Sequence, residues 1–262
     1  MNHRLCLNTF AHLSDEEFAG ILARGWGRVR VEHEDFARVK AQCEPRGIAP
    51  LFILRPGEED RVPEATMCEL GNENNAGCAP DWERMTPRAY ADWALRAWEI
   101  LLPRSCTLYV GAINNLSPSA LAWLREVLSY LPTHDQLRVS AHRYSDPDGD
   151  VTHAKKGFRS LAAENRAWLD VVAGRHWAIT EAGLVDAYYR DWSSWKYFGK
   201  RRLRTAADGH RWQATRFLDL GADFYTVYQL HDGAGTDWID RLGIRAQSGA
   251  WKEPLASLPL TL

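Results

Sequence analysis

The chain has 262 residues, of which 45% are hydrophobic and 25% are charged, and its formal net charge at pH 7 is −2. This composition is typical of a folded protein, and the near-zero charge gives no reason to expect nucleic acid or a membrane surface as a partner. No apolar run approaches the ~20 residues that a membrane-spanning helix needs.

The five cysteines and the N-terminus indicate the compartment. An odd number of cysteines without paired or zinc-type spacing argues against a disulfide framework and against a zinc site. The first residues lack the basic region and the apolar run of a secretory signal. We therefore expect a cytoplasmic protein, although the same feature suits a phage- or lysis-associated protein.

Short apolar runs alternate with helical patterns along the chain. The runs that we interpret as strands are Leu5–Asn8, Val29–Glu32, Pro50–Leu54, Ala65–Leu70, Thr107–Ala112, Leu137–His142, Trp177–Thr180 and Phe224–Leu230. Helix starts are indicated by a capping box over Ser14–Glu17 and by the pairs Thr86-Pro87 and Ser117-Pro118. Later helical patterns cover Phe158–Ala173 and Arg211–Leu220.

Eight alternations of this kind predict parallel strands and a single (β/α)8 TIM barrel that spans residues 1–262. A doubly wound open sheet is the rival architecture. Such folds often carry a glycine-rich phosphate loop, and neither G-x-G-x-x-G after the first strand nor a P-loop occurs in this sequence.

Two of the predicted strands lead into a glutamate. The stretch Met67–Asn75 reads MCELGNENN, so that Glu73 follows a strand and a glycine turn, and Glu181 ends the apolar run that begins at Trp177. In a parallel barrel all strand carboxyl ends open on one face. Two carboxylates on one face are what glycoside hydrolysis requires, because one protonates the leaving oxygen while the other attacks or activates water.

Other side chains are placed to complete this site. Asn72 would put an amide beside the acid, Arg30 and Tyr144 could orient a carboxylate and keep it ionised, and His142 could line the same pocket. Glu69 also lies in a predicted strand, and the sequence leaves open whether it faces the barrel interior or the helices.

These motifs resemble the strand-four and strand-seven signatures of the clan A glycoside hydrolase barrels. The resemblance rests on Asn72-Glu73 within ELGNENN and on Glu181 within ITEAG. It implies that Glu73 is the acid/base, that Glu181 is the nucleophile and that Asn72 binds the sugar 2-hydroxyl. It also implies retention at the anomeric carbon and a carbohydrate substrate.

Further positions are similar to those of the clan. Arg30 is similar to a strand-two arginine, His142 and Tyr144 to strand-six positions, and Gly243-Ile244 and Trp251–Pro254 to a stretch after strand eight, where Trp251 would be a sugar platform. Asn74 departs from the proline that many members carry after the acid/base, and the Tyr228 strand lacks their tryptophan.

The resemblance thus implies a retaining glycosidase that acts on a β-linked oligo- or polysaccharide, and such an enzyme needs neither a metal nor an organic cofactor. A glycan-binding barrel that has kept the carboxylate pair is the first alternative. An aldolase or a phosphate-binding isomerase is the second. It would need a Schiff-base lysine at a strand end or a glycine-rich phosphate loop, and the predicted strands contain no lysine.

Overall fold

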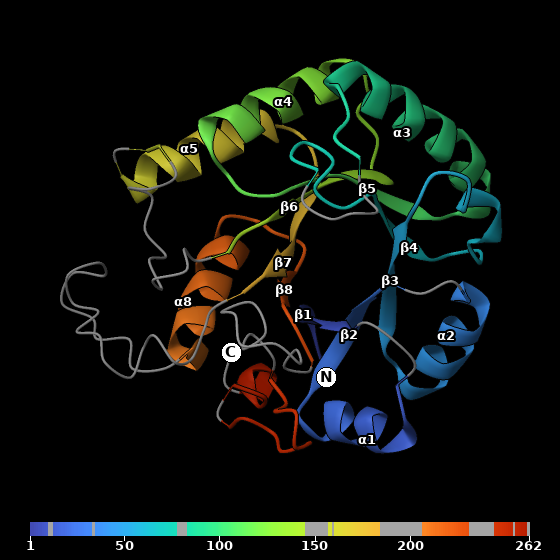
Figure 1. Ribbon diagram of the computed structural model, residues 1–262, viewed down its shortest axis with the longest axis vertical. Coiled ribbons are helices and arrows are strands. Elements are labelled where there is room, and N and C mark those ends of the chain that lie inside the picture. The colour runs from blue at the N-terminus through green and yellow to red at the C-terminus, as the bar shows by residue number, and fades with distance from the viewer. Residues whose placement is uncertain are drawn as a thin grey trace.

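Eight strands close into a barrel in the order of the sequence, and each strand is parallel to both of its neighbours (Figure 1). The computed structural model describes residues 1–9, 13–32, 35–77, 83–144, 157–158, 160–183, 206–230, 244–253 and 255–260. The predicted (β/α)8 architecture is therefore confirmed. None of the helices in these described ranges is long and apolar enough to cross a membrane.

The strands are short, as is usual for barrel strands. They are β1 Asn2–Thr9, β2 Trp26–Val31, β3 Ala49–Leu54, β4 Met67–Leu70, β5 Thr107–Ile113, β6 Leu137–His142, β7 Trp177–Ala182 and β8 Tyr225–Val227. The last strand is shorter than predicted because regular pairing stops at Val227. Two backbone bonds continue beyond it, from Tyr228 N to Ala182 O and from Leu230 N to Asn8 O, both 2.8 Å long.

A ring of helices surrounds the strands (Figure 1). The helices are α1 Asp15–Ala23, α2 Phe36–Cys43, α3 Pro87–Leu101, α4 Pro118–Ser129, α5 Leu161–Val171 and α8 Ala206–Asp219. The predicted start signals are confirmed: Ser14 forms a full capping box with Glu17, and Thr86 and Ser117 cap helices that have proline in the first turn. Helix α8 begins at Ala206, five residues before the predicted Arg211. Its first turn contains Gly209, and glycine disfavours helix, so the sequence does not indicate this earlier start.

The rhythm of strand and helix is irregular at two points. Between β3 and β4 the chain makes only the short 3-10 helix η2, Glu59–Arg61. After β8, residues 244–253 and 255–260 pack beside β1 and α1 (Figure 1), and Trp26 Nε1 donates to Ala256 O at 2.8 Å. This segment covers the side of the barrel that an eighth helix would otherwise cover.

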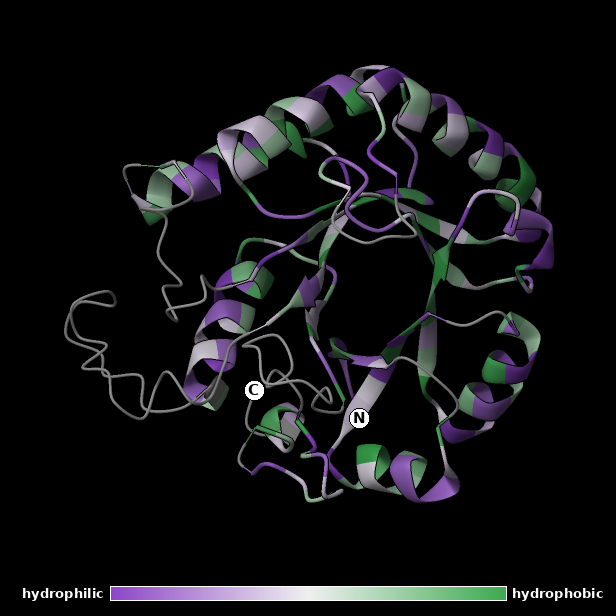
Figure 2. Ribbon diagram, viewed as in Figure 1, coloured by the Kyte–Doolittle hydropathy of each residue, from purple (hydrophilic) through white to green (hydrophobic). Residues whose placement is uncertain are grey.

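Two separate apolar layers support the barrel. Between strands and helices lies the main core, to which α3 contributes Tyr90, Trp93, Ala94, Ala97 and Leu101. Figure 2 shows that the surrounding helices carry hydrophobic and hydrophilic residues side by side, as amphipathic helices do. A second, smaller cluster takes one residue from each odd-numbered strand and adds Phe224: Cys6, Leu51, Tyr109, Ala178 and Phe224.

The second cluster fills the barrel interior, since side chains from alternate strands share a layer there. Two residues further along β1 and β4, the interior becomes polar. Cys6 is followed by Asn8 on β1, and Met67, which packs against the cluster, is followed by Glu69 on β4. The apolar layer thus forms a floor for a polar layer at the carboxyl ends of the strands.

Candidate active site

The side chains of the site converge at the carboxyl ends of four strands. Arg30 lies on β2, His142 ends β6 and Glu181 lies near the end of β7. Glu73 follows β4, and Tyr144 follows β6 by two residues. Segments that are far apart in sequence are therefore brought to one rim by the closure of the barrel.

The turn after β4 explains why Glu73 points into the site. Gly71 has a φ of +75°, and a Cβ at this position would collide with Asn74 Oδ1. Glu73 itself has a φ of +55°, a left-handed conformation that costs a non-glycine residue on the order of 1 kcal/mol. The bond from Glu73 N to Ala112 O, 2.9 Å long, holds this conformation.

Asn74, the residue that replaces the proline of many clan members, anchors the same turn. Its side-chain Nδ2 donates to Glu83 O at 3.1 Å, and its carbonyl accepts from Met85 N at 2.8 Å. A proline here would lack the side-chain donor. The departure therefore has a structural reason in the loop that leads to α3.

Glu181 and His142 are neighbours across β6 and β7. They are register partners, and the register of this strand pair shifts between Ala141 and His142. Irregularities of this kind re-aim side chains and are frequent beside active sites. The shift lets both residues face the barrel interior.

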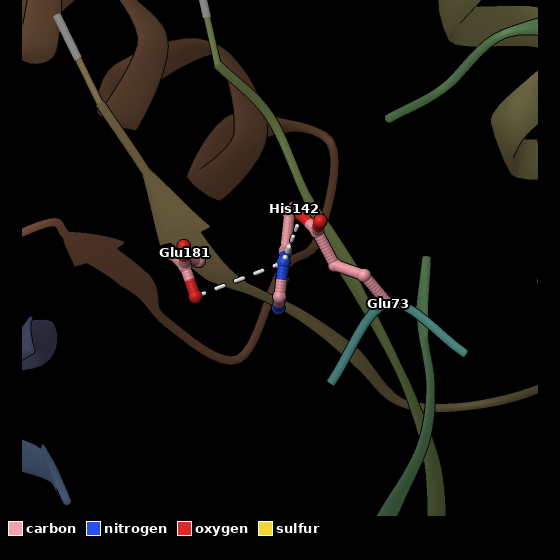
Figure 3. A group of neighbouring side chains, drawn as sticks. All are labelled: Glu73, His142 and Glu181. Carbon is pink, nitrogen blue, oxygen red and sulfur yellow. Dashed lines mark hydrogen bonds and ion pairs between the residues drawn. The ribbon is translucent and has the colours of Figure 1, made fainter. Parts of the chain in front are cut away.

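His142 lies between the two candidate catalytic carboxylates (Figure 3). Its Nδ1 is 2.9 Å from Glu73 Oε1 and 3.7 Å from Glu181 Oε2. The imidazole is completely buried, whereas the Glu73 side chain is 13% exposed. A buried ring therefore links two carboxyl groups, of which Glu73 is open to an incoming substrate.

Arg30 is the hub of the polar layer and is 1% exposed. Its Nε donates to Glu69 Oε2 at 2.6 Å, and its Nη1 donates to Glu181 Oε2 at 2.7 Å. Nη1 also donates to Asn8 Oδ1 at 2.9 Å, and Nη2 donates to Asn72 Oδ1 at 3.0 Å. Because a guanidinium presents its donors in a fixed fork, it orients all four partners at once.

The charges in the site shift one another's protonation. Burial raises the pKa of Glu181, and the negative charges of Glu73 and Glu69 add to this rise, while His142 and Arg30 oppose it. Burial alone would lower the pKa of His142, but the carboxylates Glu181 and Glu73 raise it above its usual value. Burial would raise the pKa of Glu69, but Arg30 and His142 hold it below its usual value.

One oxygen of Glu73, one oxygen of Glu181 and a ring nitrogen of His142 lie within 4.8 Å of one another. Carboxylate oxygens and imidazole nitrogens are common ligands of divalent cations. Here, however, Arg30 Nη1 already contacts Glu181 Oε2, and Tyr144 OH donates to Glu181 Oε1. The guanidinium supplies the positive charge beside the carboxylate, so the arrangement fits a hydrogen-bonded carboxyl pair better than a metal centre.

Six of the seven predicted site residues lie together. They are Glu73, Glu181, Asn72, Arg30, His142 and Tyr144. Trp251 does not lie with them, and its prediction as a sugar platform is corrected. Its indole lies 4.1 Å under the Arg24 guanidinium and in tight contact with Gly20, both near the C-terminal end of α1. Gly243 and Pro254, which belong to the same stretch that is similar to the clan, lie outside the described residues.

From the sequence, Asn8 was not identified as part of the site, and Glu69 was not established to face the barrel interior. Asn8 is the single amide in the apolar run of the first strand, a signal that could have been used. Tyr228, just past β8, contacts the Tyr144 ring edge-to-face, with centroids 5.7 Å apart. Burial and the negative charge of Glu181 raise its pKa.

Known structures share this fold, although their sequences differ widely. The Clostridial cellulose synthase subunit Z of Clostridioides difficile is 13% identical with a TM-score of 0.61, and the match covers 98% of this chain and 99% of that one. A glycoside hydrolase 5 lichenase from Caldicellulosiruptor sp. F32, in complex with cellotetraose, is 10% identical with a TM-score of 0.61 and coverages of 98% and 92%. Cel5A of Thermotoga maritima, in complex with mannotriose, is 13% identical with a TM-score of 0.57 and coverages of 95% and 90%.

No protein family and no curated protein matches this chain at the level of sequence. At identities this low, the structural likeness establishes the fold and not the activity. The resemblance to the clan A glycoside hydrolase barrels is thereby confirmed as a resemblance of fold.

Proposed function

We propose that this protein is a retaining O-glycoside hydrolase that cleaves a β-glycosidic bond in an oligo- or polysaccharide. The observation that carries the proposal is the pair Glu73 and Glu181, whose nearest functional oxygens lie within 4.8 Å at the carboxyl end of a parallel barrel. Retaining enzymes hold their two carboxyl groups ~5–5.5 Å apart, whereas inverting enzymes need ~6.5–9.5 Å to admit a water molecule. The glycosidases among the structures of the same fold support the same reading.

In the first step, Glu181 attacks the anomeric carbon while Glu73 gives its proton to the leaving oxygen. Arg30 and Tyr144 both donate hydrogen bonds to Glu181, which favours its ionised form. The products are the free leaving alcohol and a glycosyl ester of Glu181.

In the second step, Glu73 is ionised and takes a proton from water as the water attacks the same carbon. The ester bond breaks, and Glu181 leaves as a carboxylate. Asn72 uses its Oδ1 to accept from Arg30, so its Nδ2 is left to donate to the sugar 2-hydroxyl. The two steps need no metal ion and no organic cofactor.

The test is turnover of a broad panel of aryl β-glycosides and β-linked polysaccharides, followed by proton NMR of the first product. We expect cleavage with the β-anomer formed first. A first product in the α-form would contradict the retaining mechanism. Failure to cleave any member of the panel, together with binding of a glycan, would replace the enzyme by the glycan-binding barrel.

Tyr144→Phe tests how Glu181 is kept ionised. The change removes a hydrogen bond to a charged group, and we expect kcat/KM to fall about 10- to 100-fold. Because that donor stabilises the carboxylate, its loss raises the pKa of Glu181 further. The acidic limb of the pH profile of kcat/KM, which follows ionisation of the nucleophile, therefore moves to higher pH.

Tyr130→Phe is the matched control, because Tyr130 follows α4 and its side chain is 38% exposed. It should leave both the rate and the pH profile unchanged. A Tyr144→Phe enzyme whose acidic limb stays at the wild-type position would show that the phenol does not govern the ionisation of Glu181.

A further inference from the structure

Glu69 is a third carboxylate in the polar layer, and the two-step mechanism does not use it. It lies on β4, its side chain is completely buried, and its Oε2 accepts from Arg30 Nε at 2.6 Å. Its Oε1 lies 3.9 Å from His142 Nε2. Burying a carboxylate costs free energy unless cations compensate its charge. The burial of Glu69 therefore favours a function for it in the site.

We propose that Glu69 is a positioning residue that acts as the constant counter-charge of the site, holding Arg30 and a protonated His142 beneath the two catalytic carboxyl groups. The proposal rests on the proposed function. Glu69 touches neither the substrate nor the reacting atoms, and it acts through the guanidinium and the imidazolium. Its Oε2 fixes one edge of Arg30, which leaves Nη1 directed at Glu181.

The charges of the cluster support this assignment. Before the first step, with Glu73 protonated, the two cations Arg30 and His142 face the two anions Glu69 and Glu181. After the glycosyl ester forms, Glu181 is neutral and Glu73 is ionised, so the same two cations face Glu69 and Glu73. The buried cluster therefore stays neutral in both half-reactions, and the negative charge only moves between the catalytic carboxyl groups.

Without Glu69, the same protonation states would leave one uncompensated positive charge in a buried site. The imidazole would then bind its proton less tightly, so its pKa would fall. His142 Nε2 is 3.4 Å from Arg30 Nη2, so a neutral ring could accept from the guanidinium instead. A protonated ring therefore indicates that Glu69 acts as the counter-charge, and a neutral ring indicates that it does not.

Titratable groups face Glu69 from several elements. They are Cys6 of β1, Arg30 of β2, Tyr90 of α3, His142 of β6 and Glu181 of β7. Cys6 and Tyr90 are buried, and burial raises the pKa of each, so both are neutral across the working range. The charge balance at Glu69 is therefore set by Arg30, His142 and the two catalytic carboxyl groups.

The first test is the pH profile of Glu69→Gln, measured as kcat/KM on an aryl β-glycoside that the wild type cleaves. Loss of a negative charge makes every proton in the coupled cluster bind less tightly. We expect both limbs of the profile to move to lower pH by about one unit, the scale of a charge interaction at 4–6 Å. A rate loss that is uniform across pH, with both limbs in place, would assign Glu69 a structural role only and overturn the proposal.

Two variants serve as controls. Glu69→Asp keeps the charge, so its limbs should stay at the wild-type positions even if the rate falls. Glu59→Gln removes another buried carboxylate, one that accepts from Trp93 Nε1 at 2.6 Å on the helix side of the barrel. It should leave both limbs in place, and a shift like that of Glu69→Gln would overturn the proposal.

The second test needs no activity and so separates this proposal from the proposed function. The wild type is labelled with 15N-histidine, and the His142 signal is identified by its loss in His142→Asn. We expect both ring nitrogens of His142 to be protonated at pH 6 in the wild type. In Glu69→Gln, we expect the midpoint of the His142 titration to fall by about one pH unit. A neutral His142 at pH 6 in the wild type would overturn the proposal, even if Glu69→Gln did not fold.

Discussion

Glu181→Ala should lower the turnover of an aryl β-glycoside by about 10⁵-fold, because loss of a covalent nucleophile removes the catalytic path and not one hydrogen bond. The methyl group leaves a space beside Arg30 Nη1, which in the wild type lies 2.7 Å from Glu181 Oε2. A small anion can enter this space. With azide and an activated leaving group, we expect partial recovery of the rate and an α-glycosyl azide as the product, since azide attacks from the side that Glu181 had occupied.

The stereochemistry of that product is the decisive measurement, and proton NMR of the isolated azide provides it. Glu126→Ala is a suitable control, because Glu126 is an exposed carboxylate on α4. It should retain full activity and respond to azide as the wild type does. A Glu181→Ala enzyme that keeps a tenth of the wild-type rate would rule out Glu181 as the nucleophile.

Glu73→Ala should lower turnover by about 10²- to 10⁴-fold, the usual contribution of a general acid/base. The loss should depend on the leaving group. A dinitrophenolate needs little protonation, so its first step survives and hydrolysis of the glycosyl ester becomes rate-limiting. A poor leaving group such as an alkyl alcohol should lose the full factor, and polysaccharide cleavage should be abolished.

Azide distinguishes the two carboxyl groups. In Glu73→Ala it attacks the glycosyl ester of Glu181 without help from a base, so we expect a β-glycosyl azide and an accelerated second step. Rate loss that is equal for all leaving groups, with no effect of azide, would contradict the role of Glu73 as acid/base. An α-azide from Glu73→Ala together with a β-azide from Glu181→Ala would mean that the two roles are exchanged.

The resemblance of the motifs indicated the candidate catalytic pair because the signals are local. Gly71 predicts the turn that carries Asn72 and Glu73 into the site, and its φ of +75° confirms this requirement. Glu181 stands at the end of an apolar run, and strand ends can be located from sequence when the runs are short and bounded. Parallel pairing then places such ends on one rim.

Trp251 shows where local resemblance stops being informative. The segment after β8 has no strand or helix period, so its path depends on what surface remains uncovered once the barrel has closed. That surface lies along β1 and α1, where Trp26 Nε1 binds Ala256 O and Trp251 packs on Gly20. A tryptophan in such a segment follows the packing and not the motif.

By itself, the sequence determined the alternation of elements, the helix starts and the two strand-end glutamates, since each depends on residues close together in the chain. Only the tertiary structure decided that Glu69 faces inward. Both faces of a barrel strand are buried, so the apolar pattern of β4 does not distinguish the interior from the helix layer. The inward choice is made by the partners, Arg30 from β2 and His142 from β6, which reach Glu69 only after the barrel has closed.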